Sequence, residues 1–169
     1  MEEAKKEGFL PISLGKRILR TETAAITTLS LIMMHLEFGE NRGNVYKFAH
    51  SVIDAGADIV LGHGPHVTRA VEVYNGKFIA YSMGNFNTYG RFNLQGANGI
   101  APLLNIKINC KGDFLYADVL SVKQTKANGL LLDDDCKVFE EMKRLTKLDF
   151  PETPLHFEND KIQLKTLTN

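Results

Sequence analysis

The sequence lacks several features from which a function could be assigned by composition. Only two cysteines, Cys110 and Cys136, occur among its 169 residues, and they do not have the CxxC spacing of a zinc knuckle or a redox motif. Neither sign of charge is in excess, because the 20 basic and 20 acidic residues cancel and are interspersed. A basic stripe that would bind nucleic acid or an anionic membrane is absent, so no nucleic-acid partner is expected.

A long hydrophobic run is also missing. The longest apolar stretch, AAITTLSLIMMHL at residues 24–36, is interrupted by threonines and a serine. It is shorter than the ~20 residues of a membrane-spanning helix. Basic residues precede it as in a signal peptide, but a long polar segment comes first and no small-x-small cleavage site follows. Neither a spanning helix nor a signal peptide is predicted.

The remaining sequence fits one domain with a hydrophobic core, since 44% of the residues are hydrophobic. The segment GENRGNVYKFAHSVIDAGADIVLGHG predicts a helix over 44–56, with Asn44 as its N-cap and Gly56 at its left-handed end. A short buried strand over 58–61 and a glycine-rich loop follow. In α/β proteins, loops at the carboxyl ends of strands bind ligands, so this loop is a candidate site.

Turn signals divide the rest of the chain into further elements. Asn75-Gly76 predicts a hairpin, and the expected strands cover residues 70–74, 77–83, 102–108 and 114–121. A long loop over 84–99, a surface helix over 133–148 and an edge strand in KIQLKTL complete the prediction. The expected fold is α/β (α+β), in layers, with these strands in one mainly mixed sheet and helix 44–56 packed on it.

Two of the five histidines, His63 and His66, flank Gly64-Pro65 in the candidate loop. Glycine and proline together restrict such a loop to one shape, which can direct two imidazoles at one point. Imidazole nitrogens are ligands for zinc and similar ions. The alternative is that one histidine caps backbone groups and the other is solvent-exposed.

Three motifs follow one another here: DAGAD at 54–58, GHGPHV at 62–67 and YSMGNF at 81–86. Together they resemble the closing block of the CapA-type (PGA_cap) poly-gamma-glutamate capsule-biosynthesis family. That family is similar to calcineurin-like metallophosphoesterases, in which a late Gly-His-x-His loop supplies metal ligands. The resemblance implies that His63 and His66 bind a divalent metal such as manganese, zinc or iron.

The same resemblance implies two substrate-binding residues. Asn85 would hydrogen-bond a substrate oxygen, with capping of its own loop as the alternative. Arg69 would pair with a carboxylate or phosphate, with a surface ion pair as the alternative. His50 and His156 have no partner at ligand spacing and are interpreted as structural or solvated, and Gly112-Asp113 is interpreted as a turn.

The ligands that a complete two-metal site needs are not found upstream of the loop. The Asp-x-His, Gly-Asp and Gly-Asn-His elements of the superfamily do not occur before His63. We therefore predict a divergent or truncated N-terminal segment at 1–38 and the C-terminal half of a CapA-type domain at 39–125. Residues 126–169 are expected to form a helix and an extended tail packed on it.

Two functional hypotheses remain open. The chain is either a CapA-like protein that makes or processes poly-gamma-glutamate with a metallophosphoesterase-like metal site, or a non-catalytic binding or scaffold fragment. The expected ligand is an anionic polymer or a small molecule, and the resemblance suggests the cell envelope. Half of a two-sheet sandwich would leave an apolar face uncovered, so self-association or a missing N-terminal half is also expected.

Overall fold

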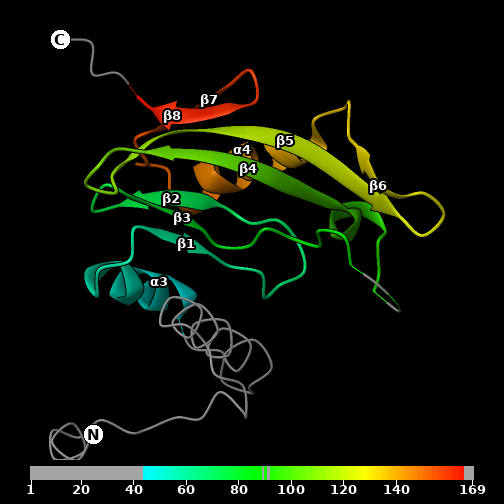
Figure 1. Ribbon diagram of the computed structural model, residues 1–169, viewed down its shortest axis with the longest axis horizontal. Coiled ribbons are helices and arrows are strands. Elements are labelled where there is room, and N and C mark those ends of the chain that lie inside the picture. The colour runs from blue at the N-terminus through cyan, green and yellow to red at the C-terminus, as the bar shows by residue number, and fades with distance from the viewer. Residues whose placement is uncertain (1–43, 89, 91, 166–169) are drawn as a thin grey trace, which may run out of the picture. The chain divides into compact units, whose positions relative to one another are not determined.

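A computed structural model describes residues 44–88, 90 and 92–165, which belong to one compact unit, Arg42–Asn169 (Figure 1). In chain order the elements are α3 (Val45–Asp54), β1 (Ile59–Leu61), β2 (Val71–Tyr74), β3 (Lys77–Ala80), the 3-10 helix η1 (Gly96–Gly99), β4 (Ile100–Ile108), β5 (Phe114–Thr125), β6 (Gly129–Leu132), α4 (Lys137–Asp149), β7 (Leu155–Glu158) and β8 (Lys161–Leu164). The apolar run at 24–36 and the segment 1–38 lie outside the described residues. Each described helix is too short or too polar to cross a lipid bilayer.

The strands form two sheets. The first has the order β1-β3-β2, with β1 parallel and β2 antiparallel to β3. The second is antiparallel, with the order β4-β5-β8-β7 and β6 paired to β5. The layered α+β class is confirmed, whereas the prediction of one mainly mixed sheet is wrong. Alternation of apolar residues shows which face of a strand is buried, and it does not show which strand lies beside it.

The two sheets share one hydrophobic core. The rings of Phe78 on β3 and Phe114 on β5 stack with centroids 4.8 Å apart, and both side chains are fully buried. Helix α4 adds Val138 and Met142 to the same cluster. Residues from both sheets and from α4 form this core together. Each sheet therefore needs the other to bury its apolar face.

Helix α3 forms as the sequence predicts. The Asn44 side chain accepts a hydrogen bond of 2.9 Å from the Lys47 amide, which is the N-cap interaction, and Gly56 has a φ of 105° just beyond the helix. The helix buries Ala49 and Ile53 against Ile79 of β3. It therefore covers the face of the first sheet that is turned away from the shared core.

The hairpin between β2 and β3 also matches its prediction. Asn75 and Gly76 have φ angles of 49° and 78°, the left-handed values of a type I′ turn. Strand β3 ends at Ala80, three residues earlier than expected. The chain from Tyr81 onward instead forms the loop that contacts the segment after β1.

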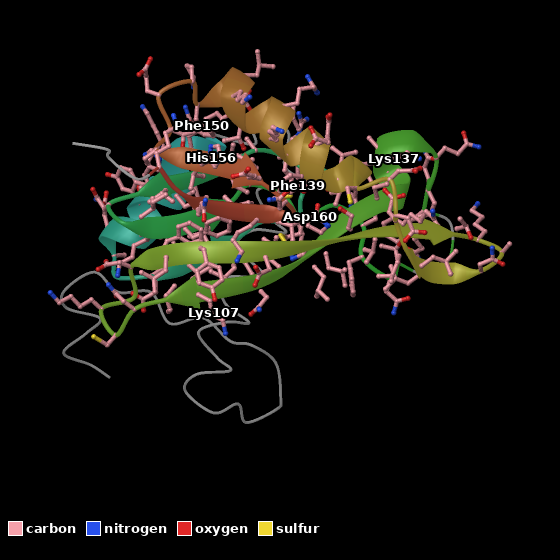
Figure 2. The ribbon with its side chains drawn as sticks, turned by 90° about the horizontal axis from the view of Figure 1, so that it is seen from above. Lys107, Lys137, Phe139, Phe150, His156 and Asp160 are labelled. Atoms are coloured by element: carbon pink, nitrogen blue, oxygen red, sulfur yellow. The ribbon has the colours of Figure 1, made fainter. Side chains whose placement is uncertain are left out.

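The second sheet differs from the prediction in its C-terminal part. Strand β5 continues to Thr125, and β6 was not predicted, although Asn128-Gly129 is a hairpin signal ahead of it. The predicted edge strand is wrong in its position, because β8 lies between β5 and β7. Figure 2 shows α4 beside the β7–β8 hairpin, where the rings of Phe139 and Phe157 have centroids 6.0 Å apart.

The face of the second sheet opposite the core carries exposed leucines. Leu103 and Leu120 are cross-strand partners and are 50% and 47% exposed. Leu132 on β6 lies on the same face, opposite Val122, and is 57% exposed. Self-association through such a patch stays a prediction, as do the domain boundaries at 38 and 125.

Candidate functional site

The candidate loop lies at the carboxyl edge of the first sheet. Because β1 and β3 are parallel, the segment containing His63 and the segment containing Asn85 leave the sheet at the same edge. Gly62 joins them, since its amide donates to the Ala80 carbonyl and its own carbonyl accepts from the Met83 amide, both at 2.8 Å. The loop therefore lies where the sequence predicted it, at the carboxyl ends of the strands, where ligands bind in open α/β sheets.

His63 and His66 belong to one tight turn. The His66 amide donates to the His63 carbonyl at 3.3 Å, and His66 has a φ of 57°. A left-handed backbone is unusual for a residue with a side chain and persists only where surrounding contacts hold it. His63 is exposed and His66 is half-buried. The turn therefore presents one imidazole to solvent and packs the other against the domain.

Asn85 is the residue that the structure brings against His66. Its Oδ1 lies 2.8 Å from Nδ1 of His66, and its Nδ2 donates to the Asn98 carbonyl at 3.0 Å. The Asn85 residue is 2% exposed. Both ends of the amide thus have partners inside the protein. A contact between Asn85 and a substrate stays a prediction.

Asn98, which lies in η1, was not singled out from the sequence. Its Nδ2 donates to the His66 carbonyl at 3.3 Å. The ring of Phe92, in the same long loop, has its centroid 5.1 Å from that of His66. The abundance of asparagine in the 84–99 loop was the available signal, although it could not show which asparagine reaches the histidine.

Arg69 lies just ahead of β2, with its amide donating to the Ser82 carbonyl at 3.0 Å, and its side chain is exposed. Within the described residues its guanidinium makes no ion pair. Burial and the nearby Asp149 carboxylate raise the pKa of Tyr46, and the Arg69 charge acts in the opposite direction. Its predicted pairing with a substrate anion stays a prediction.

Residues 44–88, 90 and 92–165 contain no group of three or more histidine, cysteine, aspartate or glutamate side chains placed to hold a metal ion. His63 and His66 are therefore a pair of imidazoles and not a complete ligand set. The other two described histidines have structural partners, as interpreted from the sequence. His50 is 2.9 Å from Glu72, and His156 is 3.3 Å from Glu158.

Glu72 is the centre of a polar network that the sequence did not reveal. Its Oε2 accepts hydrogen bonds from His50 and from the Tyr81 hydroxyl, and its side chain is 14% exposed. Burial, together with the Glu72 carboxylate, raises the pKa of Tyr81 well above its ordinary range. His50 also stacks on Tyr74 with centroids 3.8 Å apart. This network fastens α3 to β2 and to the segment after β3.

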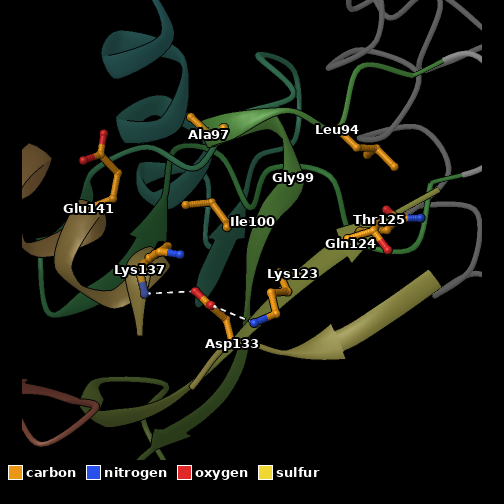
Figure 3. A pocket seen from close by; sticks show the side chains of 11 residues that line it. Leu94, Ala97, Gly99, Ile100, Lys123, Gln124, Thr125, Asp133, Lys137 and Glu141 are labelled. Atoms are coloured by element: carbon orange, nitrogen blue, oxygen red, sulfur yellow. Dashed lines mark hydrogen bonds and ion pairs between the residues drawn. The ribbon is translucent and has the colours of Figure 1, made fainter. Parts of the chain in front are cut away.

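A pocket of about 580 Å³ lies between η1, β5 and the start of α4 (Figure 3). Its buried Asp133 accepts a hydrogen bond from the Lys137 amide and pairs with Lys123 at 3.5 Å. Its second carboxylate, Glu141, is held by two 2.8 Å hydrogen bonds from Arg144. Each acidic group of the pocket thus already has a partner within the protein. The histidine loop remains the better candidate site.

Comparison with known proteins finds sequence similarity that covers the histidine loop. Residues 14–89 match a family model described as "Bacterial capsule synthesis protein PGA_cap". The matched region includes the turn with His63 and His66 and the Asn85 segment. It begins inside the segment that was expected to be divergent. The similarity to this bacterial capsule synthesis family thus covers residues 14–89 of the 169-residue chain.

Curated relatives carry related names. The chain is 58% identical over 40 residues to the PGA biosynthesis protein CapA of Bacillus subtilis (strain 168), an alignment covering 24% of this chain and 10% of the relative. It is 35% identical over 81 residues to the capsule biosynthesis protein CapA of Bacillus anthracis, covering 45% and 20%. A probable polyglutamine synthesis accessory protein of Mycobacterium tuberculosis (strain CDC 1551 / Oshkosh) is 40% identical over 62 residues, covering 34% and 16%. The aligned parts thus span a fifth or less of each relative.

Proposed function

We propose that this chain acts in the biosynthesis of poly-gamma-glutamate, with His63 and His66 as two ligands of a divalent metal site. The observation that supports the proposal most directly is the hydrogen bond between His66 and Asn85. It joins the GHGPHV and YSMGNF motifs, which lie in the family match, in one place. The names of the CapA relatives supply the biological process.

The donor set fits a transition-metal ion in its chemistry. Two imidazoles come from a turn whose backbone is held by hydrogen bonds to the β3 segment, so little freedom is lost when an ion binds. Manganese, zinc and iron all accept imidazole ligands. A bound ion would polarise a phosphoryl or acyl oxygen of the substrate. Arg69, exposed next to the loop, would hold an anionic group such as the carboxylates of poly-gamma-glutamate.

The second candidate function is a binding or scaffold role without catalysis. It is supported by the described residues having no third metal ligand near His63 and His66. In that case the loop would shape the edge of the first sheet, and the exposed leucines of the second sheet would contact another chain. The two functions differ in whether the purified chain binds a metal.

Calorimetric titration of the full chain with zinc and manganese tests the proposal. We expect one ion per chain and a loss of binding in both His63→Ala and His66→Ala. His156→Ala is the matched control, because His156 is exposed and its partner among the described residues is Glu158. Binding that survives both loop substitutions, or no binding at all, would overturn the metal site and leave the scaffold function. A metal-loaded chain would then be assayed on phosphoesters and on poly-gamma-glutamate.

A further inference from the structure

Three residues from separate segments form a closed ring of hydrogen bonds. The His66 ring contacts the Asn85 side chain, the Asn85 amide donates to the Asn98 backbone, and the Asn98 amide donates back to the His66 backbone. The loop after β1, the loop after β3 and the helix η1 are thus connected at one point. Such a ring resists movement, because displacing any one member breaks two hydrogen bonds.

The ring also determines where the His66 proton lies. The Asn98 carbonyl oxygen can only accept, so the end of the Asn85 amide that faces it must be the NH₂ group. The other end, Oδ1, then faces Nδ1 of His66, and a carbonyl oxygen can only accept there too. Nδ1 must therefore carry the hydrogen. In a neutral imidazole the lone pair is then on Nε2.

Burial prevents the opposite arrangement. Turning the Asn85 amide over would place its carbonyl oxygen against the Asn98 carbonyl oxygen, whichever ring nitrogen of His66 carried the hydrogen. Asn85 is 2% exposed, so water cannot compensate for such a mismatch. The Phe92 ring, 5.1 Å from the imidazole centroid, further limits rotation of the histidine.

We propose that Asn85 and Asn98 are positioning residues, which hold His66 in the tautomer with hydrogen on Nδ1 and so make Nε2 the working nitrogen. Hydrogen bonds of this kind to the second ring nitrogen orient metal-binding histidines in general. That Nε2 binds a metal rests on the proposed function, but the tautomer does not. Asn85 acts on the site through its hydrogen bond to the His66 ring. Asn98 acts through its contacts with Asn85 and with the His66 backbone.

The tautomer is measured directly by long-range ¹H–¹⁵N correlation NMR on the ¹⁵N-labelled full chain, at about pH 8.5, where histidine is neutral. His66→Gln identifies the signals of His66. We expect hydrogen on Nδ1, although an unconstrained histidine in water favours hydrogen on Nε2. In Asn85→Ala the equilibrium should return toward the Nε2–H form. In Asn98→Ala, which loses the donor to the His66 carbonyl, His66 should show greater exchange broadening.

Two further variants distinguish a loss of His66 positioning from a general loss of protein stability. Asn85→Asp keeps an oxygen opposite Nδ1 and should retain the Nδ1–H tautomer even if stability falls. Asn105→Ala is the matched control, because Asn105 lies on β4 and pairs with Asp118, and it should leave His66 unchanged. A wild-type chain in which His66 carries its hydrogen on Nε2 would overturn the inference.

Metal affinity provides the second readout. Loss of a hydrogen-bond partner of a metal-binding histidine typically weakens metal binding by about 10–100-fold. We expect a loss of this size in Asn85→Ala, with recovery in Asn85→Asp. An Nδ1–H tautomer in a chain that binds no metal would support the positioning and overturn the metal site. The two proposals therefore fail in different measurements.

Discussion

The α-carbon of Gly62 faces the backbone of Tyr81 so closely that a Cβ at this position would lie 2.4 Å from the Tyr81 carbonyl oxygen. No side chain fits there without moving the backbone that connects the histidine loop to the segment after β3. The close approach explains why glycine begins the loop.

We expect Gly62→Ala to lower the free energy of unfolding by about 1–3 kcal/mol, because the methyl group meets backbone that cannot rotate away. Urea unfolding followed by circular dichroism measures the change. Gly129→Ala is the comparison, since Gly129 has a φ of 69° and open space around it. It should cost only the left-handed strain of about 1–2 kcal/mol and leave metal binding intact. Equal metal affinity in Gly62→Ala and the wild type would contradict the role of Gly62 in shaping the loop.

Lys77 connects the first sheet to the β4–β5 turn. Its Nζ pairs with Asp58 at 3.0 Å and with Asp113 at 3.3 Å, and it also donates to the Lys111 carbonyl. The hydrogen bond with Asp58 raises the pKa of Lys77, whereas hydrogen bonds from Asn109 and then Lys77 lower the pKa of Asp113. These interactions make stability depend on pH at both extremes.

The lowered pKa of Asp113 stabilises the fold above the unfolded carboxyl pKa of about 3.9, and this contribution is lost as the pH falls through the native value. The raised pKa of Lys77 stabilises the fold below about 10.4, and this is lost as the pH rises through the native value. Lys77→Met should therefore reduce stability most at neutral pH. It should also weaken the dependence of stability on pH at both the acidic and the alkaline end. Urea midpoints at about pH 3, 7 and 11 measure this. Lys126→Met, at an exposed turn position, should leave the profile unchanged.

The Tyr81 hydroxyl donates to the buried carboxylate of Glu72. Tyr81→Phe removes this charge-assisted hydrogen bond and should cost about 1–3 kcal/mol. Because the native pKa of Tyr81 is raised, its contribution is present below the unfolded value of about 10 and is lost at higher pH. The variant should accordingly lose less stability than the wild type between neutral and alkaline pH. Tyr116→Phe is the control, since the Tyr116 hydroxyl has no hydrogen bond within the described part of the chain.

The Thr146 hydroxyl in α4 accepts a hydrogen bond of 3.0 Å from the Val71 amide in β2, and Thr146 is fully buried. Thr146→Val has nearly the same shape but leaves that amide without a partner. We expect a loss of about 1–3 kcal/mol and faster hydrogen exchange at the Val71 amide. Thr146→Ser should restore the protection. Unchanged exchange in Thr146→Val would show that the bond does not fasten α4 to the first sheet.

Local features of the fold could be predicted because the residues that cause them are neighbours in the chain. Asn44 caps α3 through an amide three residues away, and Asn75-Gly76 takes a turn that few other residue pairs favour. The position of the His63–His66 loop at a sheet edge followed from the same local pattern of helix, strand and glycine-rich loop. Family motifs then indicated which of the five histidines are candidate metal ligands.

The pairing of distant strands could not be predicted in the same way. Strand β8 reads as an edge strand because it is short and close to the end of the sequence, yet it pairs with both β5 and β7. A strand's own residues fix its buried face, whereas its neighbours are selected by the packing of the whole core. For the same reason one mixed sheet was expected where Phe78 and Phe114 join two sheets.

The sequence by itself thus determined the caps of α3, the type I′ turn, the layered α+β class and the place of the two-histidine loop, because these depend on residue type and short spacing. Tertiary structure alone decided that Asn85 and Asn98 converge on His66 and that Glu72 receives both His50 and Tyr81. The physical reason is that a buried polar group must find its partner wherever folding brings one within hydrogen-bond distance. In His66 that partner, 19 residues away in the chain, also sets the position of the ring proton.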